Sequence, residues 1–119
     1  MFARDAAVLQ GTLELLVLKR LSWGPMHGYG IARWIETATD DVLRVEEGSL
    51  YPALYRMIRK GWIKGEWGTS DNNRRAKFYR LTKTGQLELE QQANGWVRLS
   101  DAVSRAVTAS APTTSGPRR

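Results

Sequence analysis

The chain has 119 residues, enough for one small domain with a modest core, and its 18 Lys and Arg against 12 Asp and Glu give a net charge of +6 that favours a polyanionic partner. Cysteine is absent, which excludes disulfide frameworks and thiolate metal sites. The sequence shows neither a signal-peptide core nor an apolar run near the ~18 residues of a membrane span, so we expect a cytoplasmic protein that does not cross a membrane.

The first predicted helix spans residues 9–21. The segment is leucine-rich and apolar on nearly all sides, which indicates burial on more than one face. In so small a chain, part of that surface is expected to meet a second subunit, with Leu13 and Leu16 in the interface. Gly24-Pro25 then breaks the helix.

Residues 27–38 are predicted to form the second helix, and residues 42–45 either a short strand or an extended link. The residues expected on the inner face of this helix are Tyr29, Ile31, Ala32 and Ile35. Trp34 and Trp62 are likewise expected in the core. His27 is the single histidine, and no nucleophile motif, phosphate-binding glycine loop or paired metal-ligand spacing accompanies it. We therefore expect it to serve local structure, and we expect no enzyme, metal site or cofactor.

The third predicted helix runs from about residue 49 to residue 60. Ser49 is the expected N-cap, and Pro52 should lie in the first turn, because proline breaks a helix interior. Four apolar residues fall on one face: Leu50, Leu54, Met57 and Ile58. The residues expected on the other side are Ser49, Pro52, Arg56, Arg59 and Lys60, with Tyr51 and Tyr55 on the flank between the faces. Gly61 ends the helix.

Two predicted strands, residues 62–67 and 76–81, flank a polar turn at residues 69–75. Alternation along the strands predicts that Ile63, Trp67, Tyr79 and Leu81 point to the core. Eight cations cluster here: Arg59, Lys60, Lys64, Arg74, Arg75, Lys77, Arg80 and Lys83. A helix, a strand, a basic turn and a second strand, in that order, outline a winged helix-turn-helix.

The last predicted helix is capped by Thr82 and runs to about residue 107. Apolar residues recur along it at helical spacing: Leu89, Ala93, Trp96, Leu99 or Ser100, Val103 and Val107. Asn94-Gly95 interrupts this stripe and costs helix stability. A stripe beyond a domain that is already closed is expected to pack against another copy, with Leu89, Trp96, Val103 and Val107 in the dimer interface.

We therefore expect a mainly α fold with a small β-hairpin. Its parts are a winged helix-turn-helix DNA-binding domain at residues 1–82, a dimerisation helix at residues 83–107 and a disordered tail at residues 108–119.

Four motifs carry a family resemblance: GYGI at residues 28–31, GSLYPALYR at 48–56, KGWI at 60–63 and NRRAKFYRLT at 73–82. In these motifs, and over roughly residues 9–107, the chain resembles the PadR family of bacterial transcription regulators, especially its short branch with a single C-terminal helix. The resemblance implies a homodimeric winged helix-turn-helix that represses by occupying an operator and is often released by a small molecule. Because a dimer carries two reading helices, we expect the operator to be near-palindromic, with half-sites about one helical turn apart.

The third helix is the predicted reader of double-stranded DNA. The residues expected at the major groove are Ser49, Pro52, Arg56 and Lys60, with Tyr51 and Tyr55 against phosphate or sugar. The predicted hairpin at residues 62–81 is the wing of this fold. The residues expected to bind the neighbouring backbone from the wing are Asn72, Asn73, Arg74, Arg75 and Lys77. The alternatives are a solvated helix face, with tyrosines packed on the core, and an ordinary exposed hairpin tip.

Trp96 is the candidate ligand-binding residue. In some short members of the resembled family, a tryptophan on the last helix stacks on flat aromatic compounds at the dimer centre, and the alternative is a tryptophan that only packs in the interface. Three other functions stay open: a ligand-binding sensor, a winged-helix module that contacts an acidic protein, and an RNA-associated domain. The last lacks the exposed aromatic ladder expected for stacking on single strands.

Overall fold

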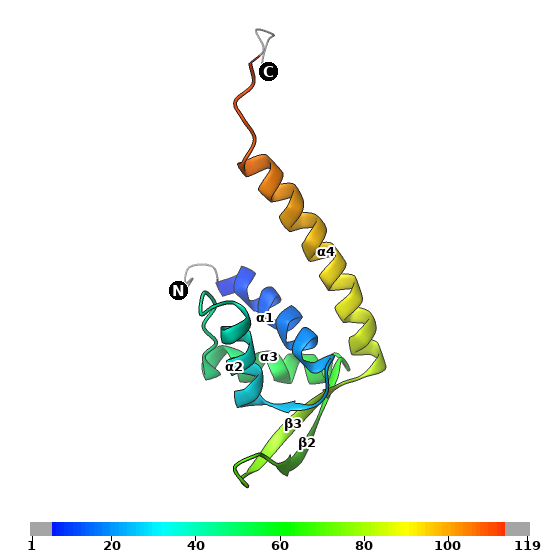
Figure 1. Cartoon of the computed structure of the whole chain (residues 1–119). Helices are drawn as coiled ribbons and strands as arrows, with labels where there is room; N and C mark the ends of the chain where they lie inside the picture. The colour runs from blue at the N-terminus through cyan, green and yellow to red at the C-terminus, as the bar shows by residue number, and fades with distance from the viewer. Residues whose placement is uncertain (1–5, 114–119) are drawn as a thin grey trace.

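The computed structural model describes residues 6–113. The elements in chain order are α1 (Ala6–Leu21), β1 (Met26–His27), α2 (Gly28–Ala38), α3 (Glu47–Arg59), β2 (Ile63–Thr69), β3 (Arg75–Leu81) and α4 (Lys83–Val107). Helices α1 to α3 form the body, the β2–β3 hairpin projects from it, and α4 leaves the body on another side (Figure 1). The prediction of a mainly α winged-helix fold with a small hairpin is confirmed. No helix among the described residues is long and apolar enough to cross a membrane.

The sheet is antiparallel, and its strand order is β1-β3-β2. The hairpin register pairs Ile63 with Leu81 at its base and Thr69 with Arg75 at its tip. Strand β1 adds Met26 opposite Tyr79. It has no counterpart among the expected elements, because two residues give no alternation of polar and apolar side chains.

The core lies between α1, α2, α3 and the base of the hairpin. Its largest fully buried side chains are Val17, Leu18, Ile31, Ile35, Leu50, Leu54, Met57 and Ile63. Each such side chain contributes roughly 1.5–3 kcal/mol by leaving water. Leu13 is buried in this same core, so it offers almost no surface to a second subunit.

Two helices start at other residues than predicted. Helix α2 starts at Gly28, one residue later than predicted, and His27 is its N-cap. The His27 Nδ1 accepts a hydrogen bond from the Gly30 N–H at 2.9 Å, which confirms the predicted local structural role of this histidine. Helix α3 begins at Glu47 with Glu46 as its N-cap, so the prediction that Ser49 is the N-cap is wrong. Pro52 therefore lies inside the helix and, having no N–H, cannot donate to the carbonyl four residues earlier.

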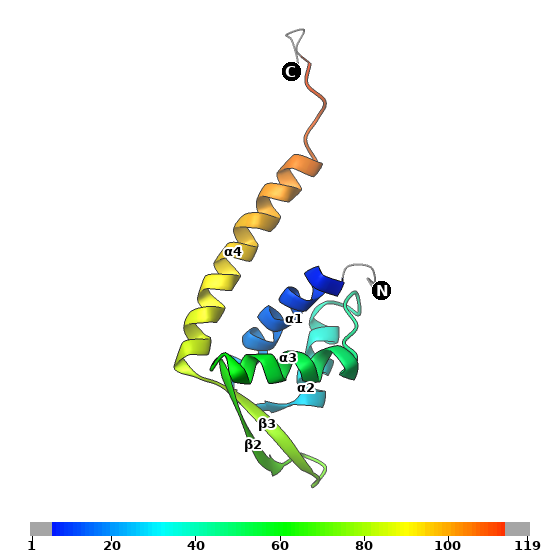
Figure 2. The ribbon, with the colours of Figure 1, turned by 180° about the vertical axis from the view of Figure 1, so that it is seen from behind.

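Two aromatic residues predicted to be in the core are exposed. Trp67 is 62% exposed because β2 and β3 extend past the helices, so only the base of the hairpin is covered (Figure 2). Tyr29 is 70% exposed at the first turn of α2. Trp34 and Trp62 do pack, partly buried, against the core. Residues 42–45 form turns and a link with no strand, which settles the alternative left open for them.

Helix α4 begins where the sequence predicts. The Thr82 Oγ1 accepts from the Gly85 N–H at 3.0 Å, and the helix continues without a break through Asn94-Gly95. Its first half lies beside α1, where Leu89 is buried, and its second half extends beyond the body (Figures 1 and 2). That second half leaves apolar side chains exposed: Trp96, Val97, Leu99, Val103 and Val107.

Candidate nucleic-acid interface

The outward face of α3 is centred on Pro52, Tyr55 and Arg59, all exposed and spaced so that they share one side of the helix. The Arg59 guanidinium lies 5.8 Å from the Tyr55 ring centroid, close enough for a cation–π contact. Ser49 is exposed nearer the start of the helix. This face offers a permanent cation, a phenol and a hydroxyl, which are donors suited to phosphate and to base edges.

Arg56 and Lys60 do not lie at the centre of that face. Both lie on the flank of α3 toward α1, where the Arg56 Nε donates to the Glu14 Oε2 at 3.0 Å and the Lys60 Nζ lies 3.6 Å from the Glu14 Oε1. The sequence predicts both residues on the outer side of the helix, and both side chains are partly exposed, but their ion pairs with Glu14 direct them toward α1. A helical wheel separates inside from outside, but it does not show which neighbour lies along each flank.

Tyr51 lies on the opposite flank, against the start of α2. A Cβ added at Gly28 would lie 2.7 Å from the Tyr51 Oη, so the glycine allows this close approach. Burial raises the pKa of the Tyr79 hydroxyl above its ordinary value, and the nearby Tyr51 raises it further. Tyr51 thus both packs between elements and keeps part of its surface exposed.

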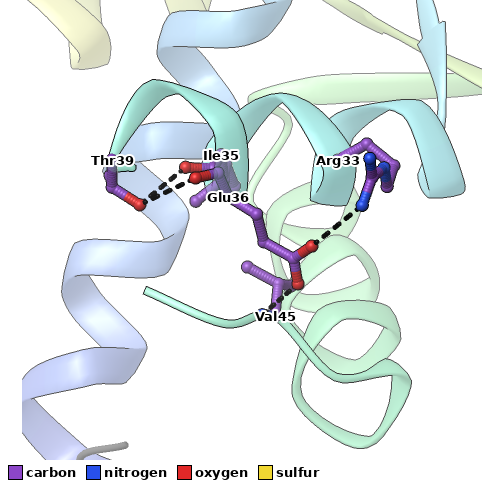
Figure 3. Close-up of polar contacts among 5 residues, drawn as sticks. All are labelled: Arg33, Ile35, Glu36, Thr39 and Val45. Atoms are coloured by element: carbon purple, nitrogen blue, oxygen red, sulfur yellow. Dashed lines mark hydrogen bonds and ion pairs between the residues drawn. The ribbon is translucent and has the colours of Figure 1, made fainter. Parts of the chain in front are cut away.

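Side chains at the end of α2 hold the loop that precedes α3 in place (Figure 3). The Glu36 Oε2 accepts from the Val45 N–H at 3.0 Å, and its other carboxylate oxygen lies 3.7 Å from the Arg33 guanidinium. The Thr39 hydroxyl donates to the Ile35 carbonyl at 2.9 Å and accepts from the Leu43 N–H at 3.2 Å. These bonds hold both ends of the connection, so α3 enters at a defined position relative to α2.

The wing tip is held by its own turn. The Ser70 hydroxyl donates to the Asn72 side-chain oxygen at 2.7 Å, and the Ser70 N–H donates to the Arg74 carbonyl at 2.8 Å. Asn73 takes a left-handed conformation with φ of 63°, which asparagine tolerates better than most residues. All five residues predicted to bind DNA from this hairpin are exposed: Asn72, Asn73, Arg74, Arg75 and Lys77.

An open groove joins the wing to the helices. Its lining includes Tyr29, Tyr51, Trp67, Arg74, Arg75 and Lys77. The Arg75 guanidinium lies 4.8 Å from the Trp67 ring centroid, so the wing presents a stacked aromatic–cation pair. The sequence pattern did not predict that Tyr29 and Trp67 line this groove. For Trp67 a signal existed, because the residue is two positions before the polar turn and so lies near the far end of the hairpin.

Trp96 lies on a different surface, on the half of α4 that extends beyond the body. It is 48% exposed in the single chain. Val103 and Val107 follow it at spacings of two and three helical turns, so the three side chains share one side of α4. The wing tip lies at the opposite end of the molecule (Figure 1).

Comparison with known proteins agrees with this arrangement. Residues 17–91 match the model of the transcriptional regulator PadR-like family, which is well over half of the 119 residues. A PadR-like transcriptional regulator from Bacillus cereus has a similar crystal structure, with a TM-score of 0.76 and 28% identity over 87% of this chain and 99% of that one.

Two further proteins are similar to this chain over most of its length. A PadR family regulator from Eggerthella lenta aligns with a TM-score of 0.69 and 28% identity over 92% of this chain and 100% of that one. An uncharacterized protein from Lysinibacillus sphaericus is 23% identical over 96 residues, which cover 81% of this chain and 88% of the relative.

Proposed function

We propose that this chain, which belongs to the PadR-like family of transcriptional regulators, is a sequence-specific DNA-binding homodimer that represses transcription by occupying a near-palindromic operator. The observation that carries the proposal is the shared surface of α3 and the wing. There Tyr51 of the helix lines the same open groove as Arg74, Arg75 and Lys77 of the hairpin. Tyr55 and Arg59 are exposed on the outward face of the same helix. Helix α3 enters the major groove, and the wing contacts the adjacent backbone.

The dimer places two copies of α3 in successive major grooves, with half-sites about one helical turn apart. The apolar stripe on α4 supports the pairing, because a second copy would bury it. An effector bound between the two last helices would change the spacing of the two reading helices. It can do so only if it binds one of the two spacings more tightly than the other.

Removal of the paired wing arginines tests the DNA contact. We expect Arg74→Ala with Arg75→Ala to weaken binding to every duplex and to lower the slope of log K against log salt by about one unit per lost phosphate contact. The matched control is Arg98→Ala with Arg105→Ala, which removes the same charge from exposed positions on α4. An unchanged slope in the wing variant, or an equal change in the control, would exclude the wing as a phosphate contact.

Trp96 is the proposed effector contact, and its half-exposed indole on the apolar side of α4 supports the assignment. A planar aromatic molecule would stack between the two Trp96 rings across the two-fold axis. We expect a planar aromatic cation to quench tryptophan fluorescence in the intact protein and in Trp67→Ala, which removes a different exposed indole, on the wing. The same titration should show that Trp96→Ala loses the quenching. Quenching that persists in Trp96→Ala would leave Trp96 as a packing residue only.

A further inference from the structure

Glu14 is a buried carboxylate on α1, with a side chain that is 9% exposed. Each of its oxygens faces a cation of α3: the Oε2 accepts from the Arg56 Nε at 3.0 Å, and the Oε1 lies 3.6 Å from the Lys60 Nζ. Arg56 and Lys60 are four residues apart, so both reach the same carboxylate from one flank of the helix.

The pairing is needed because a carboxylate removed from water is costly unless cations and hydrogen bonds compensate it. The two cations remain partly in solvent, with side chains that are 34% exposed for Arg56 and 47% exposed for Lys60. They therefore stand at the edge of the α3 surface proposed to face DNA, and the Glu14 carboxylate is the group that contacts both of them. The Lys60 Nζ also lies 4.5 Å from the Trp62 ring centroid. By contrast, Arg59 is exposed and has no ion pair among residues 6–113.

We propose that Glu14 is a positioning residue that holds Arg56 and Lys60 against α1 and so limits the number of phosphate contacts that α3 makes. The inference rests on the proposed DNA-binding function and refines it. Cations free to reach phosphates bind any sequence and supply most of non-specific affinity. Restraint of these two cations lowers affinity for random DNA and leaves the discrimination between sequences to the outward face of Pro52, Tyr55 and Arg59.

The direct test is Glu14→Gln in the full chain, because glutamine keeps the size and hydrogen-bonding capacity of the side chain but removes its charge. Affinity for a duplex of random sequence is measured across a series of salt concentrations. We expect tighter binding and a slope of log K against log salt that steepens by about one to two units, one for each released cation. The matched control is Glu90→Gln, an exposed glutamate on α4. It makes the same change in net charge and should leave the slope within experimental error of the parent.

A second comparison leaves Glu14 intact and so does not depend on how the buried variant folds. Arg59→Gln and Lys60→Gln remove neighbouring cations at the C-terminal end of α3. Arg59 has no ion pair among residues 6–113, whereas Lys60 is paired with Glu14. We expect Arg59→Gln to lower the slope by about one unit and Lys60→Gln to lower it by less than half as much. Equal losses would overturn the inference, because Lys60 would then be as available to phosphate as Arg59.

The possible failures are distinguishable. A folded Glu14→Gln protein with the parent slope overturns the positioning role while the parent still binds its operator. A parent protein that binds no duplex at all overturns the proposed function, and the inference falls with it. A circular dichroism melt of each variant shows which proteins are folded.

Discussion

Gly85 shows how a single atom can matter at the junction between the wing and α4. A Cβ at this position would lie 2.1 Å from the Trp62 carbonyl oxygen, a backbone atom that also accepts from the Thr82 N–H at 3.0 Å. The carbonyl cannot move without breaking that bond, so the start of β2 and the start of α4 are locked together at this point.

We therefore expect Gly85→Ala to lower the free energy of unfolding by about 2–3 kcal/mol, as measured by chemical denaturation. Gly95→Ala is the matched control on the same helix, because a Cβ there meets nothing within 4 Å. It should leave stability unchanged or raise it by up to about 1 kcal/mol, since alanine favours the helix. Similar effects at both positions would contradict the packing argument.

Arg56 is a second position where stability and binding must be separated. Its hydrogen bond to the buried Glu14 predicts that Arg56→Ala lowers the free energy of unfolding by about 1–2 kcal/mol. The expected loss is smaller than for a fully buried ion pair, because the arginine is partly exposed and Lys60 remains beside the carboxylate.

The control for Arg56 is Arg59→Ala, three residues further along α3, where we expect a change within about 0.5 kcal/mol. Urea denaturation of the two variants measures the difference. If the two variants unfold at the same urea concentration, the pair between Arg56 and Glu14 does not stabilise the fold.

At the scale of elements, the sequence pattern predicts best where the core imposes a period. The apolar stripe of α3 and the Thr82 cap of α4 follow local rules, and the structure confirms both. Trp67 does not follow the alternation rule, because β2 continues past the helices that would cover it. The capping rules also do not predict that α3 starts at Glu47, because its N-cap residue, Glu46, makes no side-chain hydrogen bond to the helix.

The candidate site was predictable in kind but not in detail. The cations of the wing follow from composition and from the polar turn, and they are exposed as expected. The involvement of Arg56 and Lys60 with Glu14 depends on how α1 crosses α3, across a separation of 42 residues between Arg56 and Glu14. The spacing of residues within α3 therefore cannot predict the contacts of Arg56 and Lys60 with Glu14.

The exposed stripe on α4 leads to a prediction about assembly. Val103 and Val107 lie on one side of the extended half of the helix, so Val103→Ser with Val107→Ser should shift the protein toward monomer. Sedimentation velocity measures this shift. The control is Leu87→Ser with Val97→Ser, two exposed apolar positions of the same helix that lie off the stripe. A variant that remains dimeric would show that the end of α4 is not the main interface.

The whole molecule is elongated, with principal extents of 68 × 29 × 21 Å. One end carries the wing and the reading helix, and the other end carries the apolar half of α4 (Figure 1). This separation fits a division of labour in which one end binds DNA and the other pairs two copies. A ligand at the α4 end would then act on DNA binding through the geometry of the pair, since it lies too far from α3 for direct contact.

The most direct test of the central claim is selection of bound duplexes from a random DNA pool at about 150 mM salt, where purely electrostatic binding is weakened. We expect recovery of an inverted repeat whose half-sites are centred about 10 base pairs apart, as two reading helices in successive major grooves require. A pool that shows no enriched sequence after repeated rounds would contradict the claim that this chain is a sequence-specific dimeric regulator.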